Sequence, residues 1–354
     1  MDRRDFLRLT GAAMATGALA ACGNGSTDTS AGSATTATGA QPIPSGNRKV
    51  RLGFIALTDC ASIVMAKELG YFAERNLDVS VEKQASWPAT RDNLLNGEID
   101  GAHCLFGMPF SVATGIGGSG QRDLKVAMML NNNGQAITLA KEFASVGYGD
   151  PAKARAALES KTPTLAMTFP GGTHDIWLRY WLRATKVDER ILKIIPIPPP
   201  QMVANMKVNT MDGFCVGEPW GAQAVDQEIG FTHLNTQDLW KHHPEKALVV
   251  NQRFVSERKD VLMDVMGAVL KASRWLDDLA SRKKASETIG AAAYVNAPPA
   301  EIEGRLLGNY NLGADLPPRT YTDDYMTFFR NGAVNFPRKA HAIWFRRSTA
   351  VSGC

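Results

Sequence analysis

Several polar residues follow predicted strands, at the positions where an open α/β sheet binds its ligand. They are Trp87, Gln135, His174 and Glu218. The indole, amide and imidazole of the first three can donate hydrogen bonds. His174 also follows a Pro-Gly-Gly-Thr turn at a predicted helix start, where free backbone N–H groups favour an anion. Because Lys246 would add a full positive charge, the set predicts a binding site for a small anion.

Each of these residues also has an ordinary structural interpretation. Trp87 can pack at the edge of a lobe, His174 can sit on the surface at a helix start, and Gln135 belongs to an Asn-rich turn. A lysine such as Lys246 is most often a surface residue. The residue types alone therefore do not decide whether these residues form an anion site.

Sequence motifs give no support for catalysis. Residues 115–120 match GxGxxG, but they follow a predicted helix and precede a predicted strand, the reverse of the dinucleotide-binding order. The sequence contains no GxxxxGK[ST], GxSxG or HExxH motif. No nucleophile with an evident base is present either. We therefore expect no enzyme, no cofactor and no metal site.

The elements that must position these residues alternate between strand and helix. Two βαβ blocks of similar size call for parallel sheets with helices on both faces, and a mostly helical segment follows at 260–330. We expect an α/β fold with two lobes around a ligand cleft. The predicted strands are 50–55, 77–81, 99–105, 125–130, 164–169, 192–197 and 213–216, and the predicted helices are 61–74, 88–97, 173–184, 201–208 and 218–227.

Composition is that of a folded globule. The chain has 354 residues, which suffices for about two domains of ~150 residues each. With 44% hydrophobic and 21% charged residues it is neither disordered nor fibrous. The formal net charge is only +4 and no run of basic residues occurs, so we expect no nucleic-acid partner.

The first 47 residues are predicted to be an export signal and a tether. Arg3-Arg4 precedes an apolar run in residues 1–21 that is too short to span a bilayer. The run ends in Leu-Ala-Ala before Cys22, like a bacterial lipoprotein box, so we expect lipidation at Cys22; the alternative is an ordinary cleavage site with a chance Cys. Residues 22–47 are rich in Gly, Ser, Thr and Ala and read as a flexible tether. The protein would then be exported, periplasmic or on the cell surface, and membrane-anchored.

Six strings between about Lys49 and Trp344 carry a family resemblance. They resemble the nitrate/bicarbonate-binding lipoproteins of ABC importers, the nitrate type of substrate-binding protein. The resemblance implies a type II periplasmic-binding-protein fold, in which two α/β lobes joined by a hinge close over a small anion. The strings are LGFIALTDCA (52–61), GEIDGAH (97–103), PGGTH (170–174), PPPQMVAN (198–205), DGFCVGEPW (212–220) and HPEK (243–246).

The family's nitrate pocket uses an indole, an amide, an imidazole and a lysine, and the positions that match are Trp87, Gln135, His174 and Lys246. Pro200 and Glu218 match residues that line the same pocket. Since an ionised Glu218 would repel an anion, we expect it to be held by Lys246 or by backbone donors, or to hold the lobes together. Bicarbonate-binding relatives place a carboxylate where this chain has Lys246, together with calcium. The resemblance therefore implies nitrate.

Hydrogen-bonding chemistry favours the same ligand. Nitrate only accepts hydrogen bonds, whereas bicarbonate carries an O–H that prefers a carboxylate. The expected function is capture of nitrate, with nitrite as a further candidate, by a monomer that delivers it to an ABC permease and its ATPase. The alternatives are a receptor for bicarbonate or another small oxyanion, and a nitrate sensor of a regulatory system.

We expect residues 48–135 to begin lobe 1, residues 136–250 to form lobe 2, and residues 251–345 to complete lobe 1 with mostly helical structure. Residues 346–354 form an atypical tail, because the relatives continue with more helix beyond Phe345.

Overall fold

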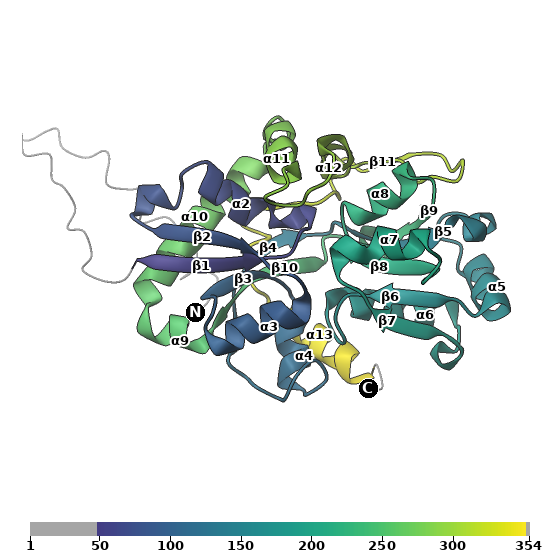
Figure 1. The fold of residues 1–354 in the computed structure, drawn as a ribbon, viewed down its shortest axis with the longest axis horizontal. Coiled ribbons are helices and arrows are strands. Elements are labelled where there is room, and N and C mark those ends of the chain that lie inside the picture. Colours follow the sequence, from purple (N-terminus) through teal and green to yellow (C-terminus); the bar gives the residue numbers. More distant parts are fainter. Residues whose placement is uncertain (1–47, 352–354) are drawn as a thin grey trace, which may run out of the picture. The chain divides into compact units, whose positions relative to one another are not determined.

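A computed structural model describes residues 48–351 (Figure 1). The predicted export signal, Cys22 and the tether lie outside the described residues. The chain from Lys49 onwards forms one compact unit. Within residues 48–351, no helix combines the length and the apolar character needed to cross a bilayer.

The first sheet has the strand order β2-β1-β3-β10-β4. Its parallel part contains β1 (Lys49–Phe54), β2 (Asp78–Lys83) and β3 (Gly101–Leu105). β10 (Pro244–Asn251) runs antiparallel to both β3 and β4 (Leu124–Asn132). β10 belongs to this sheet, so the chain has already re-entered the first lobe at the strand that carries Lys246.

The second sheet has the order β7-β6-β8-β5-β9 and repeats this plan. β6 (Thr164–Met167) runs parallel to β7 (Lys193–Pro196) and to β8 (Gly213–Gly217). β5 (Gln135–Ala140) runs antiparallel to β8 and to β9 (Gly230–Asn235). The alternation of strand and helix thus predicts the parallel strands correctly, but both sheets are mixed.

The antiparallel strands occur where the chain crosses from one sheet to the other. Only Asn133 and Gly134 separate β4 from β5, and both have a left-handed backbone, with φ of 60° and 95°. The return path runs from β9 through residues 236–243 into β10. Each crossing leads into the other sheet without a covering helix, and the strands that follow the crossings, β5 and β10, pair antiparallel with both of their neighbours. These two crossings connect the lobes.

The start of α3 (Trp87–Asn96) shows how local sequence places a candidate site residue. The Ser86 hydroxyl accepts a hydrogen bond from the Ala89 N–H at 3.2 Å, and Pro88 occupies the first turn. Gly97, with φ of 75°, ends the helix. This cap confirms the predicted helix and fixes Trp87 as its first residue, beyond the end of β2.

The helices cover both faces of each sheet (Figure 1). In the second lobe α6 packs on β6 and β8 from one side, and α8 packs on β5 and β9 from the other. Residues 115–120 form a loop between α4 and β4, as the order of elements predicts. The remaining helices are α2 (Ala61–Glu68), α4 (Met108–Ala113), α5 (Pro151–Lys161), α6 (Thr173–Thr185), α7 (Met202–Lys207), α8 (Trp220–Asp226), α9 (Gln252–Glu257), α10 (Lys259–Leu276), α11 (Ser281–Gly290) and α12 (Pro299–Leu306).

The final helix, α13 (Lys339–Val351), contacts α4 of the first lobe and α6 of the second (Figure 1). Phe345 is fully buried, with its ring centroid 5.1 Å from that of Phe106. Trp344 stacks against Trp177 of α6, with a centroid distance of 5.5 Å. Residues 346–351, predicted as part of an atypical tail, continue this helix, which therefore touches both lobes.

Candidate functional site

Three of the predicted donors meet on one carboxylate, that of Glu245. Gln135 Nε2 donates to Glu245 Oε2 at 2.5 Å, and His174 Nε2 lies 3.0 Å from Oε1. Lys246 Nζ donates to the same Oε1. Gln135 begins β5 and His174 lies in the first turn of α6, so second-lobe side chains reach a first-lobe strand.

A second carboxylate lies on the other side of Lys246. Asp59 Oδ2 accepts from Lys246 Nζ at 2.7 Å, and Asp59 Oδ1 lies 2.6 Å from His103 Nε2. Asp59 belongs to the short 3-10 helix Thr58–Cys60 that follows β1, and His103 lies within β3. Lys246 is therefore held between two carboxylates, one from the end of β1 and one from its own strand.

An irregularity in β10 makes the Glu245–Lys246 pair possible. Successive side chains of a regular strand point to opposite faces. The pairing of β10 with β4 shifts register between Pro244 and Lys246 and again between Lys246 and Ala247. Such a bulge re-aims side chains, and here it lets Glu245 and its neighbour Lys246 enter the same site.

Trp87 lies at the edge of this cluster and carries an unused donor. Its ring centroid is 6.0 Å from Lys246 Nζ and 5.9 Å from the ring centroid of His103. The indole is fully buried, and Nε1 has no hydrogen-bond partner within residues 48–351. A buried N–H of this kind is ready to donate to a ligand.

The last two predicted site residues lie apart from the cluster. Glu218 is buried, but its Oε2 accepts from the backbone N–H of Ala222 at 3.1 Å and its Oε1 lies 3.5 Å from Arg305 Nε. The Glu218 carbonyl also accepts from Thr58 N at 2.7 Å, which links the lobes. Glu218 is thus held by a backbone donor. Pro200 is exposed in the 3-10 turn before α7.

The chain also matches a known protein family. The profile of the NMT1-like family matches residues 44–290. The chain belongs to the NMT1-like family.

Relatives of this NMT1-like protein include binding proteins and an import ATPase. The nitrate/nitrite binding protein NrtA of Nostoc sp. is 38% identical over 98% of this chain and 82% of its own length. The crystal structure of the periplasmic nitrate-binding protein NrtA from Synechocystis superposes with a TM-score of 0.83 at 37% identity, covering 86% of this chain and 82% of that one. The nitrate import ATP-binding protein NrtC of Synechocystis is 34% identical over 85% of this chain and 46% of its own length. The resemblance seen in the sequence is confirmed, and so is the periplasmic-binding-protein fold with two α/β lobes.

The charged groups of the NMT1-like site stabilise one another's ionised forms. Burial alone raises the pKa of Asp59 and of Glu245, but the positive charge of Lys246 and hydrogen bonds from the histidines outweigh burial and lower both pKa values. Burial alone lowers the pKa of Lys246, but the two carboxylates outweigh it and raise that pKa. At neutral pH all three groups are charged.

The two histidines of the site are neutral at the same pH. Burial lowers the pKa of His174, and the charge of Lys246 lowers it further. Burial also lowers the pKa of His103, against the opposing effect of Asp59. His174 Nδ1 lies 2.7 Å from the Thr168 hydroxyl, which can donate to it, so the imidazole proton sits on Nε2 and faces Glu245.

The site is closed to solvent. Trp87, His174, Glu245 and Lys246 are 0% exposed, and Gln135 is 1% exposed. Hydrogen bonds join the lobes around it, such as Trp220 Nε1 to the Ala56 carbonyl at 3.0 Å and the Ser111 hydroxyl to the Pro170 carbonyl at 2.6 Å. A ligand therefore reaches these side chains only when the lobes separate.

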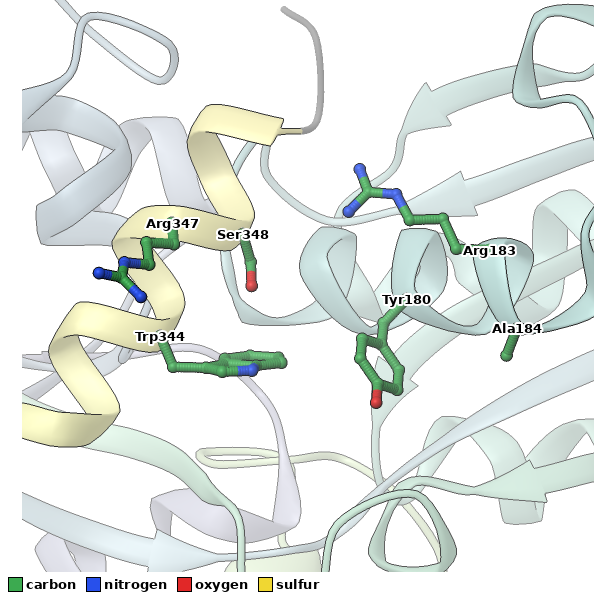
Figure 2. Close-up of a pocket in the computed structure, with 6 residues that line it drawn as sticks. All are labelled: Tyr180, Arg183, Ala184, Trp344, Arg347 and Ser348. Carbon is green, nitrogen blue, oxygen red and sulfur yellow. The ribbon is translucent and has the colours of Figure 1, made fainter.

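A separate pocket of about 440 Å³ lies between α6 and α13 (Figure 2). One of its two arginines, Arg183, pairs with Glu189 at 3.6 Å and is half-exposed. Ion pairs at such exposure are weak, unlike the fully buried pairs of Lys246 with Asp59 and Glu245. The pocket is lined by Tyr180, Arg183, Ala184, Trp344, Arg347 and Ser348.

Sequence reasoning missed Asp59, His103 and Glu245. Asp59 and His103 are titratable residues inside mostly apolar segments, Asp59 in LGFIALTDCA and His103 in the all-buried strand β3, whereas Glu245 lies in the polar string HPEK. A charged residue in an apolar run is rarely buried without a partner, and that is the signal that would have found Asp59 and His103. Among residues 48–351, no group of three or more His, Cys, Asp and Glu side chains is placed to hold a metal ion.

Proposed function

We propose that this chain is the substrate-binding component of an ABC importer, that it binds nitrate between its lobes, and that nitrite is a second substrate. Trp87, Gln135, His174 and Lys246 bind the anion. Glu218 and Pro200 lie apart from these four residues: Glu218 holds the lobes together through its carbonyl rather than contacting the ligand, and Pro200 is exposed before α7. This function requires no cofactor and no catalytic step, so the protein is not an enzyme.

The observation that carries the proposal is the convergence of donors from both lobes on one planar, negatively charged group. Gln135 Nε2, His174 Nε2 and Lys246 Nζ all contact the Glu245 carboxylate, and the partnerless Trp87 Nε1 lies beside them. Nitrate is planar and monovalent and only accepts hydrogen bonds, so a site built from donors suits it. Because the donors come from both lobes, a bound anion stabilises the closed form.

The partners and location follow from the same proposal. The closed form would dock on a membrane permease that is driven by an ATPase, and the similarity to an import ATP-binding protein supports such a system. Export by the segment 1–21 and a lipid on Cys22 would hold a monomer at the membrane. Globomycin, which blocks lipoprotein processing, should make the precursor accumulate; unchanged processing would exclude the lipid anchor.

Bicarbonate is the second candidate, because the cluster also contains acceptors. The O–H of bicarbonate can donate to a carboxylate such as Glu245 or Asp59, whereas nitrate has no donor. Lys246 argues against bicarbonate. The bicarbonate-binding relatives have a carboxylate and calcium at this position, whereas the ammonium group of Lys246 occupies both carboxylates of the cluster and would repel a metal ion.

Isothermal titration calorimetry with nitrate, nitrite and bicarbonate, the last with and without calcium, tests the proposal. We expect nitrate to bind without calcium. Binding of bicarbonate only in the presence of calcium, with no heat from nitrate, would contradict the assignment and favour the second candidate. Circular dichroism of the same sample shows whether the protein is folded.

Replacing Trp87 by Phe is expected to weaken nitrate binding by about ten- to a hundredfold. A hydrogen bond to a charged group contributes about 1.5–3 kcal/mol, and the indole N–H makes no other bond within the described region. Calorimetry measures the change. Trp177→Phe is the matched control, because Trp177 is equally buried with a partnerless Nε1 but lies in the aromatic cluster of α6 and α13. Equal losses of nitrate affinity in both variants would show that Trp87 does not bind the anion.

A further inference from the structure

The Glu245 carboxylate occupies the place that the donors define. Its Oε1 accepts hydrogen bonds from Lys246 Nζ and His174 Nε2, and its Oε2 accepts one from Gln135 Nε2. A carboxylate is planar and carries one negative charge over its oxygens, as nitrate does. Both ions therefore satisfy the same donors, and they cannot do so at the same time.

The charge of the site makes this competition stronger. With Asp59 and Glu245 ionised, Lys246 protonated and both histidines neutral, the cluster carries a net charge of −1 before any anion enters. A monovalent anion would bring the fully buried cluster to −2. Since uncompensated buried charge is costly, a proton that enters with the anion removes the penalty.

We propose that Glu245 is a tethered competitor for the anion, which releases its three donors and takes up one proton from solvent when nitrate binds. This inference rests on the proposed function. No bond between heavy atoms changes: the incoming anion accepts the hydrogen bonds of Lys246, His174 and Gln135, and one oxygen of the displaced carboxylate forms an O–H bond with a proton from solvent, which gives a neutral carboxylic acid. That acid can donate its new O–H to an oxygen of nitrate, which only accepts.

The contacts single out Glu245 over the other carboxylate. Asp59 also binds Lys246, but its second oxygen faces His103, and neither Gln135 nor His174 donates to it. An anion can therefore take the place of Glu245 while the pair of Asp59 with Lys246 remains intact. Asp59 then keeps the lysine charged and oriented.

The proton goes to Glu245 because of what changes around it. On losing the charge-assisted bonds from Lys246 and His174, and on gaining a neighbouring anion, the carboxylate loses the contacts that keep it ionised, while its burial remains. His174 stays neutral if its Nε2–H donates to nitrate. The titratable groups that face Glu245 are Lys246 on β10, Asp59 after β1, His103 on β3, His174 on α6, Cys215 on β8 and His243 before β10.

Calorimetry on the full chain tests this, with nitrate titrated between pH 6 and pH 8.5 in buffers of different ionisation enthalpy. For the wild type we expect uptake of about one proton and a Kd that rises up to about tenfold per pH unit, because binding that takes up a proton weakens as pH increases. For Glu245→Gln we expect at least about tenfold tighter binding at pH 7.5, since one ionic competitor is gone. Its proton uptake and pH dependence should be lost.

Asp59→Asn is the matched control. It also removes one negative charge beside Lys246, but it leaves Glu245 on the donors, so proton uptake should persist. If both variants bound nitrate equally more tightly and both lost proton uptake, only the net charge of the cluster would matter. That result would overturn the role of Glu245 as a competitor. Wild-type binding without proton uptake would overturn the inference even if Glu245→Gln fails to fold. Absence of nitrate binding in every folded variant would instead overturn the proposed function, and the inference with it.

Discussion

Replacing Lys246 by Met is expected to abolish measurable nitrate binding and to lower the free energy of unfolding by about 3–5 kcal/mol. Lys246 is 0% exposed and is the cation that pairs with both Asp59 and Glu245. Its removal leaves two buried carboxylates without a counter-charge. An incoming anion would add a third negative charge to the same place.

Urea unfolding measures the stability change, and calorimetry measures the loss of binding. Lys207→Met is the control for a lysine to methionine change, because Lys207 is exposed in the last turn of α7. We expect that control to shift the unfolding free energy by no more than about 0.5 kcal/mol. A similarly small shift in Lys246→Met would contradict the buried ion-pair assignment.

A double variant separates binding from stability. Adding Asp59→Asn to Lys246→Met removes one of the stranded carboxylates, so part of the lost stability should return. Nitrate binding should not return, because the cation is still absent. Recovery of binding in the double variant would show that Lys246 acts only by neutralising Asp59.

Local sequence predicts the parallel half of each sheet, because those elements carry their own signals. Ser86 and Pro88 mark the start of α3 and Gly97 marks its end, and β1 and β6 are short strands with mostly buried residues before helices. The antiparallel strands β5, β9 and β10 lack such flanking signals. β5 and β10 form where the chain enters the other lobe, and β9 pairs with β5, so their pairing is a property of the tertiary fold.

The candidate site shows the same division. Gln135, His174 and Lys246 could be named from the family resemblance, and the structure brings them together. Their carboxylate partners could not be named in this way. Glu245 is 110 residues from Gln135 along the chain, and Asp59 is 187 residues from Lys246. Which carboxylate faces which donor also depends on the bulge in β10, and no local pattern encodes that register.

A fall in pH below about 6.5 is expected to destabilise the ligand-free protein steeply. The sequence has six histidines, and burial lowers the pKa of four nearly or fully buried ones. In the unfolded chain their pKa values return to about 6.5, so the unfolded state binds protons that the folded state does not. Stability is therefore full above pH 6.5 and is lost as pH falls. The four are His103, His174, His233 and His243.

The size of the effect follows from the same linkage. Burial lowers the pKa of His243 to about 4, so this residue alone contributes on the order of 3 kcal/mol between pH 6.5 and pH 4. The lowered pKa values of the other three histidines act in the same direction and make the loss of stability steeper. Asp59 and Glu245, whose pKa values are also lowered, act in the same direction at lower pH. Asp175, whose pKa burial raises, offsets a small part.

Urea unfolding at pH 7.5, 6.5 and 5.5, without nitrate, measures this slope. His243→Gln should reduce it by about 1.4 kcal/mol per pH unit, because one titrating group is gone while the side chain can still bond to Thr236. An unfolding free energy that stays constant from pH 7.5 to pH 5.5 would mean that these imidazoles are protonated in the folded protein. His103 and His174 would then each carry a positive charge, the buried cluster would have a net charge of +1 rather than −1, and nitrate would bind there without any need for a proton on Glu245.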